Sequence, residues 1–398
     1  MPGNSSNERS RCPAATNMRG RVSCPYRQRS TVIRLCLVAV AALAMSACTP
    51  EPAHQNSDMS GVAEQAEIAP VVVTLDSIAL IEDDSAFIAL PSAIAIAPDG
   101  DIAVADIQNR RVYLYNRSGE RQRIIGRPGK GPGELSAPSG LAFIDDTLMV
   151  VDDAGAQKLL LYAYPSGVYL RSMKRVGTAL TTVGSGHSVW LGILRNSSGS
   201  TVTEWDVDTD SLRYHGSIPE SYRSSERLRQ VYGHVAATVS DNTLYYALVA
   251  DSAVSVTDRR TGEVTMHVIP TRTRRGTPAD LAARLEQTTR SEDYAGMASS
   301  LVALNAPGHD VLQAVHFDIT YDRNAITAAG FLSTLDLRTG QGCIDTRLSF
   351  SADARPQVTF VGDTLVTIDQ AVVNDRSTTY VRFLAQPTSC EIGLPRDT

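Results

Sequence analysis

A pattern of three short apolar runs occurs twice in succession, and it constrains the fold more than any other feature of the chain. The first copy spans 91–120 and reads PSAIAIAPDGDIAVADIQNRRVYLYNRSGE; the second spans 138–167 and reads PSGLAFIDDTLMVVDDAGAQKLLLYAYPSG. In each copy a turn with Asp follows the first run, the second run ends in Asp, and a polar turn leads to the third. Strands joined by tight turns and repeated at a fixed interval are typical of propeller blades. The repeat therefore predicts an all-β propeller.

A polar turn between the last two strands of each unit allows the blades to be counted. Such turns are expected at 117–119, 165–167, 208–210, 260–262, 338–340 and 387–389. Their spacing corresponds to one blade except between the fourth and the fifth, where the interval is longer. We predict six four-stranded antiparallel blades over residues 71–398. The apolar run 71–81 precedes the first blade and is expected to pair with the last blade, which closes the ring.

The long interval contains the signals of a helix. Thr277 is a capping residue, Pro278 stands at the first helical position, and Asp280 lies in the first turn. Leu281 and Leu285 follow at a spacing that places them on one helix face. We therefore predict a helical insertion at about 270–300, between blades four and five.

The N-terminal segment has the pattern of an export signal. Arg27, Arg29 and Arg34 precede the apolar run 35–44, which is too short for a stable membrane-spanning helix and leads to small residues. Because Cys48 follows directly, the segment resembles a bacterial lipoprotein signal in which Cys48 is the acylated residue. An ordinary secretory signal with an incidental cysteine is the alternative.

The lipoprotein interpretation divides the chain into a signal peptide at 1–47, a flexible tether at 48–70 and the propeller. The tether is polar, contains proline and lacks aromatic residues. Translation starts at Met1 or at Met18. Since Thr49 rather than Asp follows Cys48, we expect a lipid anchor in the outer membrane, with the propeller facing the periplasm.

Charge limits the range of partners. The chain has a net charge of −6, and the part that remains after removal of the Arg-rich leader is more acidic still. Such a balance disfavours nucleic acid and electrostatic adsorption to anionic lipid. The expected partners are the membrane, through the lipid, and another envelope protein or an anionic ligand.

Two cysteines remain beyond the leader and the anchor. Cys343 and Cys390 would be a pair in an oxidising compartment, and we predict a disulfide between them. The chain contains no CxxC motif, which excludes zinc ribbons and c-type haem attachment.

One blade carries a more specific resemblance. The stretch Val104 to Tyr115 reads VADIQNRRVYLY, and the link that follows it at 126–143 reads GRPGKGPGELSAPSGLAF. The positions of Asp106, Asn109, Arg110 and Val112, together with the Gly-rich link, resemble the NHL repeat of six-bladed propellers. The resemblance implies the fold, but it does not select a function, since such propellers include binding platforms, a peptide-amidating lyase and sensor domains.

Five of the six second strands are expected to end in an acidic residue, which allows two interpretations. These residues are Asp106, Asp152, Asp251, Asp318 and Asp369. They could form a ring of carboxylates that holds Ca²⁺ or another hard cation, as in lactonase-like propellers. Alternatively, each Asp caps its own turn by accepting backbone N–H bonds. We favour capping, and expect no cofactor, because a metal site requires a convergent cluster with further Asn or Glu ligands.

The links between blades are basic although the chain is acidic. This suggests a face that attracts an anion such as a carboxylated glycan, a peptide C-terminus or phosphate. The candidate cations are Arg127, Lys130, Arg175, Arg227, Arg272, Arg274 and Arg275. The alternative is a solvated surface with local ion pairs.

The sequence thus favours an envelope-anchored, non-catalytic binding or protein-interaction platform that uses the link-bearing face and the insertion. A metal-dependent hydrolase, lactonase or lyase using carboxylates at the channel mouth is the alternative. A purely structural spacer is a third possibility.

Overall fold

The computed structural model describes residues 70–387 except 85, 176, 178, 196, 276–277, 289–293, 295, 323–324, 350–356 and 374–375. The leader, residues 48–69 of the tether including Cys48, and Cys390 lie outside the described residues.

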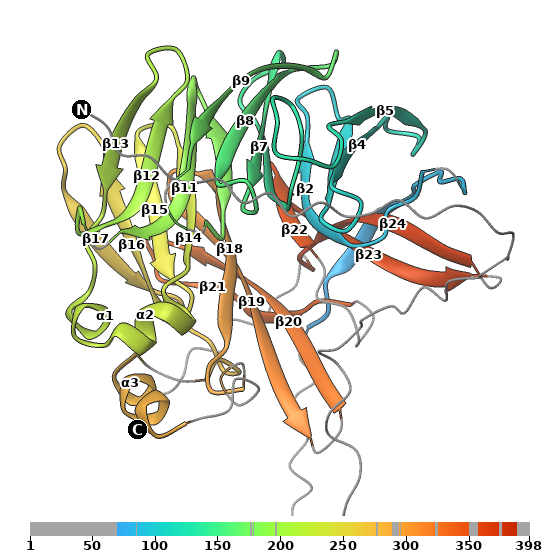
Figure 1. The fold of residues 1–398 in the computed structure, drawn as a ribbon. Coiled ribbons are helices and arrows are strands. Elements are labelled where there is room, and N and C mark those ends of the chain that lie inside the picture. The colour runs from blue at the N-terminus through green and yellow to red at the C-terminus, as the bar shows by residue number, and fades with distance from the viewer. Residues whose placement is uncertain are drawn as a thin grey trace, which may run out of the picture. The chain divides into compact units, whose positions relative to one another are not determined.

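Six four-stranded antiparallel sheets form the blades, in agreement with the prediction (Figure 1). Blade one contains β2 (Pro91–Ile96), β3 (Ile102–Asp106), β4 (Arg111–Tyr115) and β5 (Arg121–Ile125). Blade two contains β6 (Pro138–Phe143), β7 (Leu148–Asp153), β8 (Lys158–Ala163) and β9 (Val168–Lys174). Blade three contains β10 (Thr182–Ser185), β11 (Ser188–Arg195), β12 (Ser200–Asp206) and β13 (Ser211–His215).

The other three blades follow the same order. Blade four contains β14 (Val235–Ser240), β15 (Thr243–Leu248), β16 (Ala253–Asp258) and β17 (Val264–Val268). Blade five contains β18 (Ser300–Gly308), β19 (Val311–Asp322), β20 (Ala325–Asp336) and β21 (Gly342–Arg347). Blade six contains β22 (Gln357–Val361), β23 (Thr364–Val373), β24 (Arg376–Ala385) and β1 (Val73–Ala79).

The N-terminal strand closes the ring, as predicted. β1 runs antiparallel to β24, with Val73 opposite Ala385 and Ala79 opposite Tyr380. Because β1 supplies the fourth strand of blade six, the turn expected at 387–389 does not join two strands of that blade; β24 ends at Ala385, and 388–389 lie outside the described residues. The first strand of every blade contacts the first strand of the next, including β22 with β2.

The hydrophobic core lies between neighbouring blades. Six clusters of buried side chains each join two adjacent sheets; Val112, Val151 and Leu160, for example, connect blades one and two. Burying one such side chain stabilises the fold by about 1.5–3 kcal/mol. Alternating apolar residues on both faces of each blade therefore hold the ring together.

Among the described residues, three helices lie in the links on either side of blade four. α3 (Pro278–Gln287) is the predicted insertion, and its Leu281 and Leu285 are fully buried. α1 (Glu220–Ser224) and α2 (Glu226–Tyr232) lie in the preceding link and were not expected. The helices contact one another and gather at one end of the strands of blade four (Figure 1).

The strand order defines two faces of the propeller. We call the face that carries the links between blades and the turns between second and third strands the link face. The turns between first and second strands and between third and fourth strands form the opposite face, which we call the turn face.

Candidate functional site

The predicted ring of strand-terminal acids is only partly correct. Asp106 ends β3, but blade two ends β7 in Asp153, so Asp152 stands one position earlier. Asp251 follows the end of β15. Asp318 and Asp369 lie inside β19 and β23, because the hairpins of blades five and six are longer than those of the first blades.

Asp106 acts as a cap. It is fully buried, and its carboxylate accepts backbone N–H bonds from Ala89 at 2.6 Å, Gln108 at 2.9 Å and Asn109 at 3.0 Å. The Asn109 amide donates to the same carboxylate at 2.8 Å and to Phe87 O at 2.7 Å. Asp106 and Asn109, two of the residues on which the NHL resemblance rests, therefore fasten the incoming chain to the turn of blade one.

Asp153 is the equivalent of Asp106 in blade two. Its carboxylate accepts N–H bonds from Ser136 at 2.6 Å and from Ala137 and Ala156 at 2.9 Å. Periodicity could not choose between the adjacent acids, because a shift of one residue moves a side chain to the other face of the sheet.

Asp152 forms a buried ion pair with Arg175. The Arg175 Nε atom lies 3.0 Å from Asp152 Oδ1, and neither side chain is more than 1% exposed. Burial raises the pKa of the Asp152 carboxyl to about 7, against the attraction of Arg175, which favours the charged form. Burial also lowers the pKa of the Arg175 guanidinium. Desolvation therefore disfavours the charged form of both partners.

The other candidate acids also lie beside guanidinium groups. Arg275 is 2.6 Å from Asp318, and Arg382 is 3.1 Å from Asp369. Asp251 has a pKa raised by burial to about 6, with Arg274 as the largest opposing influence. Each acid therefore has a partner supplied by the protein, and the described residues contain no group of three or more His, Cys, Asp or Glu placed to hold a metal ion.

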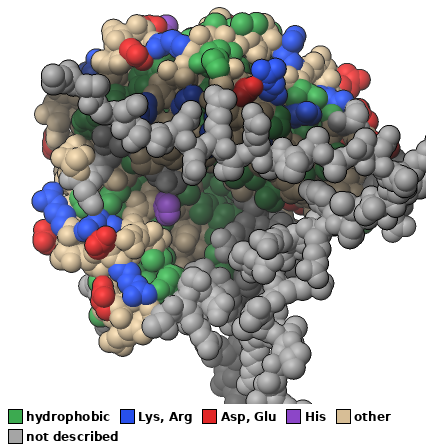
Figure 2. Space-filling model, in the orientation of Figure 1, with side chains coloured by type: hydrophobic (Ala, Val, Ile, Leu, Met, Phe, Trp, Pro, Cys, Tyr) green, Lys and Arg blue, Asp and Glu red, His purple; other side chains and the backbone are tan. Residues whose placement is uncertain are grey.

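Several of the cations expected to bind an anion are instead buried or bonded within the protein. Arg175 is buried, Arg274 donates to Val249 O at 3.0 Å, and Arg275 donates to Ile319 O at 2.7 Å. Arg227 stacks on Tyr294, 5.4 Å from the ring centre. These four hold the links in place, and over the region of α1 to α3 acidic and basic side chains lie side by side (Figure 2).

Three of the candidate cations remain exposed on the link face. They are Arg127, Lys130 and Arg272. Arg127 also bonds Glu134 at 3.0 Å, and Glu134 accepts the Gly131 N–H at 2.9 Å. The Gly-rich link therefore binds its own carboxylate, and this lowers the pKa of Glu134, chiefly through the Gly131 hydrogen bond.

Sequence reasoning missed a buried histidine. His316 on β19 is 2% exposed, its Nε2 lies 3.1 Å from Thr273 Oγ1, and its ring stacks on Phe331. Burial lowers the pKa of His316 to about 4, so the imidazole is neutral near pH 7. Because Thr273 belongs to a distant link, no local pattern could have identified the contact.

A second polar cluster joins blades three and four. Glu204, 2% exposed, lies 2.9 Å from His215 Nε2 and 3.4 Å from Arg259. The Arg259 guanidinium stacks on the buried Trp190, 4.4 Å from its ring centre. Trp190 is thus a packing residue, as is the fully buried Trp205.

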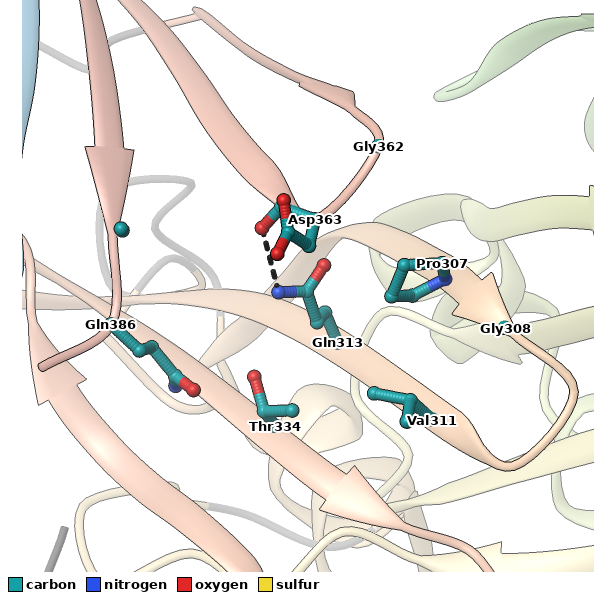
Figure 3. A pocket seen from close by; sticks show the side chains of 9 residues that line it. Pro307, Gly308, Val311, Gln313, Thr334, Gly362, Asp363 and Gln386 are labelled. Carbon is teal, nitrogen blue, oxygen red and sulfur yellow. Dashed lines mark hydrogen bonds between the residues drawn. The ribbon is translucent and has the colours of Figure 1, made fainter. Parts of the chain in front are cut away.

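A recess of about 530 Å³ opens on the turn face, between blades five and six, rather than on the link face (Figure 3). Gln313 projects toward it from β19 and donates to Asp363 O at 2.9 Å. The Thr334 hydroxyl is buried and has no hydrogen-bond partner among the described residues. The recess lies in the size range of small-molecule sites.

Cys343 lies on β21 and is disulfide-bonded. Its expected partner, Cys390, is outside the described residues, so the pairing remains a prediction. No described helix has both the length and the apolar character that a membrane crossing requires.

Comparison with known proteins supports the architecture. Residues 60–177 match the DUF5128 family, described as a six-bladed beta-propeller. A protein from Bacteroides fragilis NCTC 9343 that is described as exported has a similar fold: TM-score 0.54, 12% identity, 80% of this chain and 96% of that chain covered. A member of the DUF4221 family from Bacteroides vulgatus ATCC 8482 gives TM-score 0.55 and 9% identity over 79% of this chain and 98% of that chain. No curated protein matches in sequence.

Proposed function

We propose that the chain is an exported, lipid-anchored binding platform that lacks a catalytic centre of its own. The observation that carries this proposal is the state of the candidate acids. Asp106 binds backbone amides, and the other four lie beside guanidinium groups. Groups engaged in this way serve the fold, so the metal-dependent hydrolase is not favoured.

Export and anchoring rest on the leader and on the fold relatives. A structural neighbour is described as exported, and Cys48 follows a charged and apolar leader in this chain. An acylated Cys48 would hold the propeller at the outer membrane, on its periplasmic side. Replacing Cys48 with Ala should move the chain from the membrane fraction to the soluble fraction, and an unchanged distribution would contradict the anchor.

The binding surface that we propose is the link face, and the ligand is anionic. Exposed Arg127, Lys130 and Arg272 supply positive charge there, whereas the turns of the opposite face are rich in Asp. The partner would be an anionic ligand or an acidic patch on another envelope protein.

Retention of the full chain on an anionic matrix tests this surface. The variant carrying Arg127→Gln, Lys130→Gln and Arg272→Gln should elute at clearly lower salt than the wild type. The matched control carries Arg117→Gln, Arg260→Gln and Arg338→Gln on the turn face, with the same loss of charge. Equal elution of the two variants would contradict a link-face site.

A further inference from the structure

The lysines of this chain are few and lie together. Lys130, Lys158 and Lys174 are the only lysines in the 398 residues, whereas all other basic charge is carried by Arg and His. They are far apart in sequence: one lies in the link before blade two, one begins β8, and one ends β9. All three reach the link-face edge of blade two.

Strand pairing brings two of them into direct contact range. Lys158 and Lys174 stand opposite each other in the antiparallel pair of β8 and β9. Side chains at opposite positions lie on the same sheet face, with Cβ atoms about 4.5–5.5 Å apart. The third lysine joins them through its backbone, because Lys158 Nζ donates to Lys130 O at 3.2 Å.

The link that carries Lys130 is held by its own hydrogen bonds. Gly129 N donates to Leu135 O at 2.9 Å and Leu135 N donates to Arg127 O at 2.8 Å. Glu134 bonds Arg127 and the Gly131 N–H, which ties the middle of the loop to its ends. Lys130 is therefore presented on a fixed backbone, with an exposed side chain.

Each neighbouring carboxylate has another partner. Asp153 accepts three backbone N–H bonds, Asp152 pairs with Arg175, and Glu134 bonds Arg127. Within the described part of the chain, no ion pair involves any of the three lysines. Like charges directly opposite each other destabilise a sheet. The fold thus carries an uncompensated cluster of positive charge at this place.

We propose that Lys130, Lys158 and Lys174 form a binding site for a phosphate-bearing anion on blade two. An ammonium group is a compact point charge that binds phosphate, and a guanidinium group in its place can bind phosphate as well. Two lysines at opposite strand positions, and a third whose backbone oxygen contacts one of them, supply enough positive charge for a phosphate dianion. A lipid headgroup and a soluble phosphate ligand both present this group. The site rests on the proposed binding function and gives it a location and a ligand class.

The lysines also provide the means of testing the site. Acetylation of the full chain with an amine-specific reagent modifies lysines and the N-terminal amine only, so mass spectrometry of the three lysine peptides reports on the patch alone. Inorganic tripolyphosphate is the soluble probe, and sodium sulfate at equal ionic strength is the control for screening. We expect tripolyphosphate to slow acetylation of Lys158 and Lys174 by about tenfold at low salt, since bound anions block the amines.

A second arm distinguishes the source of the phosphate. The full chain is placed in phosphatidylcholine vesicles with or without phosphatidylglycerol, and the same peptides are measured. Protection only with phosphatidylglycerol assigns the site to a lipid headgroup, and protection only by tripolyphosphate assigns it to a soluble ligand. Acetylation that neither probe slows would overturn the proposal.

Variants separate this site from the broader link face and from a structural role. Lys158→Gln with Lys174→Gln should weaken tripolyphosphate binding about tenfold, whereas Lys158→Arg with Lys174→Arg should retain it. The Gln pair should leave the thermal midpoint unchanged or raise it, because the like-charge repulsion is removed. Unchanged binding, or a midpoint lower by several degrees, would contradict the site. If the Lys158 and Lys174 variants bind tripolyphosphate normally while the Arg127, Lys130 and Arg272 variant still loses retention on the matrix, the phosphate site is wrong. The proposed binding function of the link face would still stand.

Discussion

At the scale of single residues, the acids of this propeller divide into caps and ion pairs. Asp106 and Asp153 bind backbone amides, whereas Asp152 lies beside Arg175. The sequence predicted that acids would cap turns, and for Asp106 the hydrogen bonds agree. It could not predict the ion pairs, because Asp318 and Arg275 stand in different elements and approach only when the ring has formed.

Replacing Asp106 with Ala should strongly destabilise the protein. The change leaves the N–H groups of Ala89, Leu90 and Asn109 without their carboxylate acceptor, and we expect a loss of about 3 kcal/mol in the free energy of unfolding. Chemical denaturation measures it. Asp146→Ala, at an exposed turn of blade two, is the control and should change stability by less than about 0.5 kcal/mol. Equal effects of the two variants would contradict the capping role.

The raised pKa of Asp152 predicts a pH dependence of stability. Because the folded-state pKa of about 7 exceeds the ordinary pKa of 3.8 for an Asp carboxyl, the folded state binds the proton more tightly. This contribution is fully present below about pH 4 and is lost as the pH rises through 7, by roughly 2–4 kcal/mol.

Denaturation of the wild type and of Asp152→Asn between pH 4 and 8 tests this dependence. Asn cannot titrate, so the stability of the variant relative to the wild type should increase with pH. The unpaired Arg175 should lower the free energy of unfolding of the variant by the same amount at every pH. Parallel curves would show that Asp152 does not titrate in this range.

At the scale of elements, β1 is the closing strand, and its hydrogen bonds to β24 matter more than its side chains. Six of its seven residues face solvent and only Ile78 is partly buried. Because the exposed side chains carry no burial pattern, the apolar run predicted where β1 lies but not its register with β24. The short helices α1 and α2 lacked a periodic pattern long enough to be recognised, since each is shorter than three turns.

Breaking the closure should weaken the whole ring. Ile78→Pro removes a backbone donor from the pair with Val381 and should cost about 3 kcal/mol or more. Thermal unfolding and protease sensitivity would report the loss. Asp76→Ala, which keeps the backbone donor, should behave like the wild type. A stable, protease-resistant Ile78→Pro variant would contradict closure by β1.

At the scale of the whole molecule, the blade repeat was enough to predict the architecture. Val104, Val112 and Val151 stand in alternating runs whose period identifies strands, and all three are fully buried. The binding surface was harder to predict, since exposure depends on contacts between distant links. Arg274 and Arg272 are near neighbours in sequence, yet Arg274 is directed to Val249 O while Arg272 is exposed.

The thermal midpoint of the full chain with excess Ca²⁺ and with EDTA tests the central claim most directly, because a metal that binds the folded state must stabilise it. If the acids serve the fold through amides and guanidinium groups, the two midpoints should agree within about 1 °C. A midpoint higher by several degrees with Ca²⁺, and lost in Asp106→Asn or Asp318→Asn, would contradict the binding platform and favour a metal-dependent enzyme.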